Sequence, residues 1–257
     1  MKKLALKPPV PLRPNSKILD IGSGNNPLDI ATHLLDLIPD SDRERGGQIE
    51  IPKDKIFSEG SIEKIPFADQ FFDFVHAAHV LEHADSIPNA ISEMMRVAPA
   101  GYIETPQAVS EMGVLNVDGS KGWHFHRWLV WGFKDQKMLY LKAKDAVSDE
   151  STCRCRWSQD FKRIMAIAPY QNIDAHLPYS ARMTQLNWVK TIRFEIWASD
   201  QIGKTEGLRC NCMFAAFAER VTDYFRDIFQ IRRRMRLKKA YPEIHSIFMS
   251  WEATWPK

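Results

Sequence analysis

Short apolar runs recur along the first hundred residues, and each of them ends in glycine or polar residues. Continuous apolar runs of this length are typical of parallel strands that are buried on both faces. We predict strands over Ile18–Ile21, Thr32–Leu37, Lys55–Ser58, Phe72–Ala77 and Gly101–Thr105.

The spacing of apolar residues changes from strand-like to helical between the last two runs. Residues 86–98 carry apolar side chains at helical spacing, with Pro88 in the first turn, where proline is tolerated. Strands alternating with helices predict an α/β fold with a Rossmann-like, mostly parallel sheet. The stretch from Gly22 to Ala31 is short for a crossover between parallel neighbours, which takes about a dozen residues or more. We therefore expect a shortened first crossover that contains only a helical stub.

The pattern becomes mixed after Pro106. Two apolar runs separated by a polar tetrapeptide predict a hairpin, and a helix with Ser158 as its N-cap is expected next. An alternating run then predicts a further strand, and a long amphipathic stretch ends in a basic tract. We expect a core domain over residues 1–145 and an α+β C-terminal appendage over 146–257. The segments are Trp128–Phe133 with Met138–Lys144, Ser158–Ala168, Trp188–Trp197 and Met213–Lys239.

Composition narrows the class of protein. A chain of 257 residues with 44% hydrophobic residues can bury a sizeable core. It has no run of eighteen apolar residues and no secretory signal at its N-terminus, so we expect a cytoplasmic protein. A net charge of +3 is too small to demand a nucleic-acid partner.

Polar residues follow the predicted strands, where ligands bind in sheets of this type. Asp20 ends the first strand, and Gly22 and Gly24 allow a sharp turn and a close approach of a ligand. Asp36 ends the second strand and could accept both hydroxyls of a ribose. There is no Gly-x-x-x-x-Gly-Lys-Ser/Thr motif, and Pro27 replaces the third glycine of a pyrophosphate loop. These features favour a nucleoside cofactor without a di- or triphosphate.

Five blocks of this segment, taken together, resemble the class I S-adenosylmethionine-dependent methyltransferases, particularly the methyltransferase type 11 group. They occur in the order and spacing of that group and cover about the first 40% of the chain. They are Ile18-Leu-Asp-Ile-Gly-Ser-Gly-Asn-Asn-Pro27, Gly60-Ser-Ile-Glu-Lys-Ile-Pro-Phe67, Phe72-Asp-Phe-Val75, His79-Val-Leu-Glu-His83 and Arg96-Val-Ala-Pro-Ala-Gly-Tyr-Ile-Glu-Thr-Pro106.

The resemblance implies that the cofactor is S-adenosylmethionine and suggests a role for each matching residue. Gly22 and Gly24 would face its methionine part, Asp36 its ribose, and His79 the wall near the sulfonium. The family often has an acidic residue where Ser61 stands, which leaves the adenine amino group to the backbone. The full set expected to bind the cofactor is Asp20, Gly22, Ser23, Gly24, Asn25, Asp36, Ser61, Ile62 and His79.

Methyl transfer to a hydroxyl needs positioning and a base that accepts the proton. We predict His126 as that base, oriented by Glu104 or Glu111, with His124 on the same side of an extended segment. The alternative, that His126 only caps the hairpin, carries equal weight. Glutamate and histidine could also hold a divalent metal, but without a third ligand at a suitable spacing we predict none.

Three further features each have a structural and a functional interpretation. Cys153/Cys155 and Cys210/Cys212 would suit zinc if they converged, but their spacing is narrow and buried thiols are favoured. The basic tract over 232–239 could touch an anionic membrane, and a solvated helix end is favoured. Three tryptophans could pack against a sugar or another flat acceptor, or could pack in the core. They are Trp123, Trp128 and Trp131.

We therefore expect an S-adenosylmethionine-dependent methyltransferase that methylates an oxygen of a small molecule or glycan. The rival hypothesis is a non-catalytic cofactor-binding or assembly subunit with the same fold. A nucleic-acid methyltransferase is disfavoured, because no Asn/Asp-Pro-Pro-Tyr block follows the fourth strand and the basic residues are dispersed.

Overall fold

The computed structural model of the chain describes residues 7–37, 47–113, 123–133, 137–144, 155–168, 170–177, 179–197, 205–206, 209–210, 212–226 and 231–254. Its contacts divide into two compact units. The first unit is Met1–Thr105 with Gln185–Phe194, and the second is Pro106–Thr184 with Glu195–Lys257. The sequence-based division at residue 145 differs from this one, because a strand beyond residue 183 returns to the sheet of the first unit.

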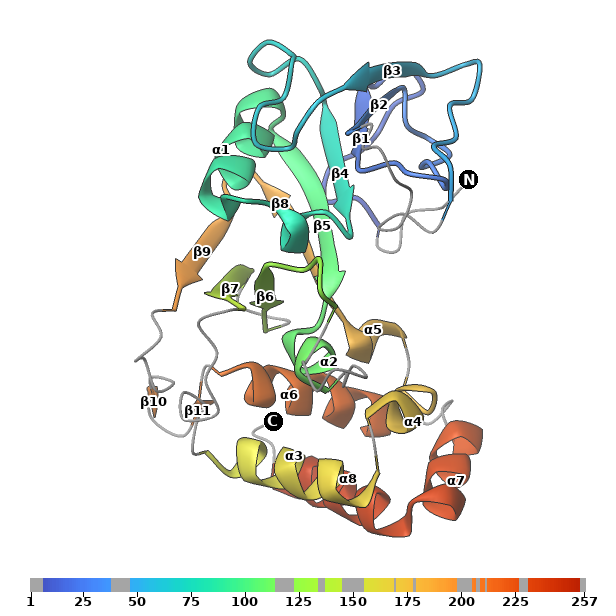
Figure 1. Cartoon of the computed structure of the whole chain (residues 1–257), viewed down its shortest axis with the longest axis vertical. Helices are drawn as coiled ribbons and strands as arrows, with labels where there is room; N and C mark the ends of the chain where they lie inside the picture. The colour runs from blue at the N-terminus through green and yellow to red at the C-terminus, as the bar shows by residue number, and fades with distance from the viewer. Residues whose placement is uncertain are drawn as a thin grey trace. The chain divides into compact units, whose positions relative to one another are not determined.

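The first unit is built on a six-stranded sheet in the order β3-β2-β1-β4-β5-β8 (Figure 1). Its first five strands pair in parallel, which confirms the predicted Rossmann-like sheet. The strands are buried by apolar side chains such as Leu19, Leu34, Phe74 and Ile103. Their bounds are β1 Ile18–Ile21, β2 His33–Asp36, β3 Ile56–Glu59, β4 Phe74–Ala78 and β5 Ala100–Pro106.

One helix connects β4 to β5, as predicted. A 3₁₀ turn, η1 (Leu81–His83), leads to α1 (Ile87–Val97), whose N-cap Ser86 accepts the Asn89 N–H. The expected helical stub between Gly22 and Ala31 was wrong. The chain crosses that gap in two turns, Asn26 N–H to Ser23 O and Ala31 N–H to Leu28 O, and so has no room for a helical run.

The sixth strand of this sheet, β8 (Met183–Val189), runs antiparallel to β5. Backbone hydrogen bonds from Gln107 N to Arg182 O and from Lys190 N to Pro99 O fix that direction. A single strand over Trp188–Trp197 was a wrong prediction. Lys190 has a φ of 64°, which turns the chain between β8 and β9 (Arg193–Ile196), and these two strands belong to different sheets.

The second unit contains the predicted hairpin. β6 (Trp128–Trp131) and β7 (Met138–Ala143) pair antiparallel, and β9 completes their three-stranded sheet. A smaller antiparallel pair is formed by β10 (Thr205–Glu206) and β11 (Arg209–Cys210).

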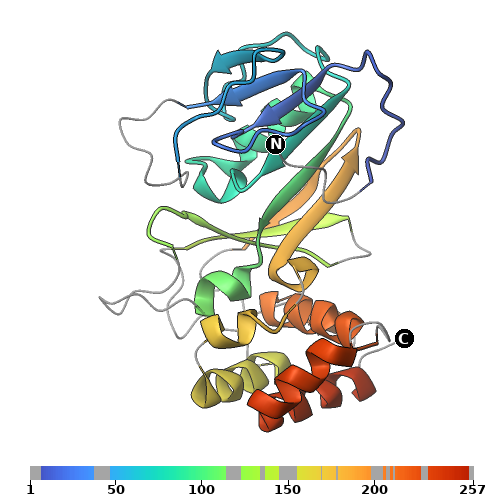
Figure 2. The same ribbon diagram turned by 90° about the vertical axis from the view of Figure 1, so that its right-hand side faces the viewer.

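The other secondary-structure elements described in the second unit are helices (Figure 2). α3 (Arg156–Ile167) begins two residues before the predicted N-cap Ser158, because Cys155 occupies the cap position and its carbonyl accepts the Gln159 N–H. The long stretch from 213 forms two helices, and a third follows. The remaining bounds are α2 Ala108–Gly113, α4 Tyr170–Asp174, α5 Tyr179–Arg182, α6 Met213–Arg226, α7 Ile231–Ala240 and α8 Pro242–Thr254.

Each unit has its own apolar core. That of the second unit is rich in aromatic residues from α3, α6 and α8, including Phe161, Phe217, Phe248 and Trp251. Trp251 also donates its indole N–H to Asp160 Oδ2 at 2.8 Å. Among the described residues, no helix has both the length and the apolar character that crossing a membrane requires.

Candidate functional site

The carboxyl ends of β1 to β4 lie at one edge of the sheet, because these strands are parallel. All residues predicted to bind a cofactor come from this edge. Asp20 and the turn over 22–25 belong to β1, Asp36 to β2, Ser61 and Ile62 to β3, and His79 to β4.

The two glycines of the turn after β1 have different surroundings. Both are in the left-handed region, with φ of 64° at Gly22 and 53° at Gly24. A Cβ on Gly22 would lie 2.2 Å from Cγ2 of Val80, whereas a Cβ on Gly24 would meet nothing within 4 Å. The Gly24 N–H donates to Asp36 Oδ2 at 2.7 Å. Gly22 is therefore required by packing, and Gly24 faces open space beside a carboxylate.

The polar groups around Gly24 fit a nucleoside ligand. The Ser23 hydroxyl is buried and has no hydrogen-bond partner among the described residues. Buried hydroxyls are rarely left in this state, so the turn carries hydrogen-bonding capacity for a ligand. Asp36 is half-buried and Asn25 is exposed. A carboxylate beside an open backbone turn suits the hydroxyls and the amino-acid end of S-adenosylmethionine.

Asp20 has a supporting position instead. Its side chain is fully buried, Oδ2 accepts the Leu28 N–H at 2.7 Å, and Oδ1 lies 2.6 Å from Nδ1 of His76. Both oxygens thus have protein partners that hold the chain after the glycine turn. Any effect of Asp20 on the cofactor would act through that turn.

The segment after β3 is folded on itself. Ser61 and Lys64 form an isolated bridge, and Ser61 Oγ accepts the Glu63 N–H at 3.1 Å. Ile62 is 6% exposed. The Ser61 hydroxyl therefore takes part in shaping this turn.

His79 lies between two carboxylates. Its φ is 60°, and its N–H donates to the carbonyl oxygen of Glu104 at 2.8 Å. Nδ1 is 3.6 Å from Glu82 Oε1, and Nε2 is 3.6 Å from Glu104 Oε1. Burial alone would lower the pKa of His79, but the Glu104 and Glu82 carboxylates outweigh it and raise this pKa to about 9. His79 is therefore a cation at neutral pH and a poor general base.

Glu82 is a site residue to which the sequence analysis assigned no role. It is 1% exposed, and neither carboxylate oxygen has a hydrogen bond among the described residues. A buried carboxylate without hydrogen bonds calls for an explanation, and a functional role is one. Its spacing of three residues from His79, inside one of the five blocks, was the signal that could have identified it.

A row of buried polar side chains connects these features across the sheet. Glu104 Oε2 accepts the Tyr102 hydroxyl and, at 2.7 Å, the amide of Gln185. The Tyr102 ring stacks on His76, which bonds Asp20. Asp20, His76 and Tyr102 are register partners on β1, β4 and β5, and Glu104 continues the row to His79. We call this set the polar row.

The predicted base lies in the second unit. His126 Nδ1 is 2.7 Å from Glu111 Oε1, and the two residues are 7% and 2% exposed. Glu111 Oε2 accepts the Trp123 N–H at 3.1 Å. Of the two predicted orienting carboxylates, Glu111 is the one found on His126, whereas Glu104 contacts His79.

The expectation of an extended segment with two parallel imidazoles was wrong. Residues 123–126 form a turn closed by the His126 N–H and the Trp123 carbonyl at 3.1 Å. The turn leaves His124 exposed and buries His126. His124 is therefore a natural control for His126.

The aromatic and basic features also divide between core and surface. Trp131 is buried and stacks on Tyr140, so its faces are not available to an acceptor. Trp123 is 48% exposed. In the basic tract, Arg233 and Arg236 of α7 line a cavity of about 350 Å³, together with His176, Tyr179 and Arg182. Part of the tract thus borders a cavity in the second unit.

Comparison with known families agrees with the geometry of the first unit. A family model described as a methyltransferase domain matches residues 19–103. This part of the first unit is therefore similar to methyltransferase domains. The matched residues span β1 to β5 and hence every predicted cofactor-binding residue, which confirms the resemblance seen in the sequence.

Solved structures with similar folds include the YcgJ protein of Bacillus subtilis, at 19% identity and a TM-score of 0.28 over 37% of this chain and 45% of that one. The complex of a Haloferax volcanii methyltransferase with the Trm112 activator has 17% identity and a TM-score of 0.29, over 38% of this chain and 48% of that one. The [4+2]-cyclase SpnF has 23% identity and a TM-score of 0.25, over 35% of this chain and 37% of that one. The chain spans less than half the length of each, and a comparison with curated proteins finds no match.

Proposed function

We propose that this protein is an S-adenosylmethionine-dependent methyltransferase that methylates a hydroxyl oxygen of a small molecule. The observation that carries the proposal is the open turn at Gly24, with the Asp36 carboxylate 2.7 Å from its N–H and the unpartnered Ser23 hydroxyl beside it. The family matched by residues 19–103 supports the choice of cofactor.

When bound, S-adenosylmethionine supplies an activated methyl group, and the protein supplies position and charge. Asp36 would accept ribose hydroxyls, and the Gly24 backbone would leave room for the chain of the methionine part. His79 would sit beside the sulfonium as a cation held by Glu82 and Glu104, so that the three groups together carry a net negative charge. A net negative surface favours a positively charged sulfonium.

His126 is the proposed base toward the acceptor hydroxyl. Donation of Nδ1–H to Glu111 leaves Nε2 as the basic nitrogen, and the carboxylate stabilises the imidazolium that forms when Nε2 takes the proton. Glu111 is a positioning residue in this scheme. A glycan acceptor loses support, because of the three tryptophans Trp131 is a core residue, Trp128 is half-buried and only Trp123 is strongly exposed.

Calorimetry tests the cofactor first. We expect binding of S-adenosylmethionine and its demethylated product, and loss of binding in Gly24→Val, where the new side chain occupies the open space at the turn. Asp36→Ala should weaken binding, and Asn187→Ala, a variant on β8 whose side-chain amide donates to the Lys7 carbonyl, should leave it unchanged. Tight binding of NAD with none of the sulfonium would contradict the proposal.

A second candidate is a non-catalytic subunit that binds the cofactor. Binding of the cofactor without formation of its demethylated product, over a broad panel of hydroxyl acceptors, would support this candidate.

A further inference from the structure

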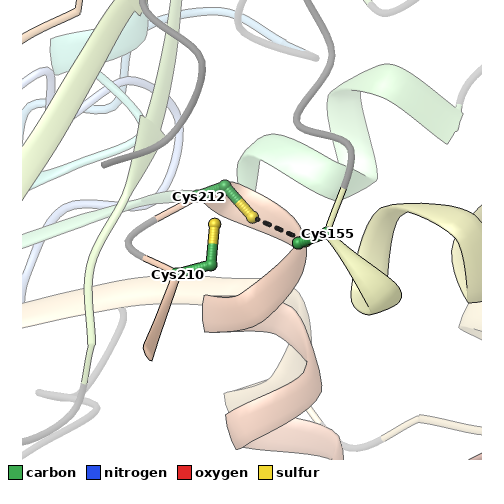
Figure 3. A group of neighbouring side chains, drawn as sticks. All are labelled: Cys155, Cys210 and Cys212. Carbon is green, nitrogen blue, oxygen red and sulfur yellow. Dashed lines mark hydrogen bonds between the residues drawn. The ribbon is translucent and has the colours of Figure 1, made fainter. Parts of the chain in front are cut away.

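Three cysteine sulfurs converge in the second unit, although they come from separate parts of the chain. Their Sγ atoms all lie within 4.8 Å of one another, and those of Cys155 and Cys212 are 3.5 Å apart. Figure 3 shows the side chain of Cys212 directed toward Cys155, with the sulfur of Cys210 beside that of Cys212. None of the three is in a disulfide.

These distances suit one shared metal ion. A disulfide requires sulfurs about 2.05 Å apart, well below 3.5 Å. Sulfurs that bind one tetrahedral zinc at about 2.3 Å are about 3.8 Å from each other. The Cys155–Cys212 separation of 3.5 Å is close to that value, and no pair of the three sulfurs is more than 4.8 Å apart. Thiolate sulfur selects zinc over magnesium or calcium, which prefer oxygen ligands.

The backbone around the cluster favours thiolates over thiols. Cys155 holds the N-cap of α3, and Cys212 precedes α6, where its carbonyl accepts the Ala216 N–H. Two helices of 12 and 14 residues thus begin at the cluster. Helix N-termini stabilise negative charge and lower the pKa of cysteine. Cysteine is also a poor substitute for the usual capping residues, so helix stability does not explain its presence at both caps.

We propose that Cys155, Cys210 and Cys212 bind one Zn²⁺ as thiolates, each releasing its proton on binding. The ion would join β11 to the first turns of α3 and α6, whose side chains build the core of the second unit. The narrow Cys-x-Cys spacing in the sequence favoured buried thiols over zinc ligands. The convergence of three sulfurs favours zinc ligands instead. Cys153 lies outside the described residues, and the fourth coordination position is not assigned.

Elemental analysis of the full chain, purified in reductant without chelator, is the direct test. We expect about one zinc per chain. Cys155→Ser and Cys212→Ser should each lose most of it, whereas Val221→Ala, which removes buried apolar volume from α6, should keep it. A strong chelator should lower the melting temperature of the wild type and leave that of Cys212→Ser unchanged.

Cobalt replacement provides evidence that does not depend on the variants folding. Co²⁺ added to metal-free protein should give sulfur-to-metal charge-transfer absorption in the near ultraviolet and the intense visible bands of tetrahedral sites. Less than about a fifth of an equivalent of zinc after refolding with the metal, or a Cys155–Cys212 disulfide in fresh protein, would overturn the proposal. Full zinc content in Cys155→Ser or Cys212→Ser would do the same.

Discussion

The two units place their buried ionisable groups in different ways. In the first unit, Asp20, His76 and Tyr102 are register partners on three parallel strands, so the polar row is ordered by the sheet itself. In the second unit, Glu111 and His126 meet because a turn over 123–126 brings the histidine inward. The sheet fixes the first arrangement through many backbone pairs, whereas the second depends on a short segment. We expect the two arrangements to respond differently to mutation.

The largest expected effect lies at the pair in the second unit. His126→Ala should lower turnover by about 10²–10⁴-fold and leave the affinity for S-adenosylmethionine nearly unchanged, since the base acts on the acceptor. Steady-state kinetics with calorimetry separates the two quantities.

The exposed neighbour gives the control, because His124→Ala should keep turnover within about twofold of the wild type if the buried imidazole is the base. Glu111→Gln should reduce turnover less than His126→Ala does. Equal small losses in all three variants, with an unaltered pH–rate profile, would assign the histidine a structural role.

Stability should depend on the aromatic core of the second unit. Trp251→Ala removes a fully buried indole and its hydrogen bond to Asp160, so the free energy of unfolding should fall by about 3–5 kcal/mol. Met249→Ala on the same helix, at a side chain 39% exposed, should change it by less than about 0.5 kcal/mol. Chemical denaturation measures both, and similar losses would mean that α8 does not pack as described.

Substitutions at the two glycines after β1 should affect different properties of the first unit, stability at Gly22 and cofactor affinity at Gly24. Gly22→Ala should cost about 2–4 kcal/mol of unfolding free energy, because the new methyl group meets Val80 and the backbone is left-handed. Gly24→Ala should cost only about 1 kcal/mol, since its Cβ enters open space. Cofactor affinity should fall in Gly24→Ala despite the milder effect on stability. The reverse ranking in urea denaturation would show that the turn is arranged differently.

The smallest expected effect is a dependence of stability on pH. Because the folded pKa of His79 is raised from 6.5 to about 9, its ion pairs stabilise the fold fully below pH 6.5 and are lost as the pH rises to about 9. The free energy of unfolding should therefore decline over this range more in the wild type than in His79→Gln. If the free energy of unfolding depended on pH in the same way in both proteins, the ion pairs of His79 would not contribute to stability.

The fold of the first unit was predicted well, because each of its parallel strands can be recognised from a short stretch of sequence. Each parallel strand is a short apolar run, and each candidate residue follows one directly, so the shared edge follows from topology alone. The spacing of Glu82 from His79 could have identified it as a candidate, but its burial depends on packing that the sequence pattern does not reveal.

The errors arose where one residue's conformation or a distant contact decided the structure. The left-handed Lys190 divides an alternating run into two strands. The turn over 123–126 separates two histidines that an extended segment would align. Ser158 was a better cap by type than Cys155, yet the helix begins at the cysteine that lies 3.5 Å from Cys212, a contact across 57 residues of sequence.

The position of β8 has a consequence for synthesis on the ribosome. The edge of the sheet beside β5 (Ala100–Pro106) is completed by β8 (Met183–Val189), which is synthesised after residues 107–182 of the second unit. Until residue 194 emerges, the nascent first unit exposes an unpaired strand edge, which is a site for aggregation or chaperone capture. Folding of the first unit is thus completed only after β8 has been translated.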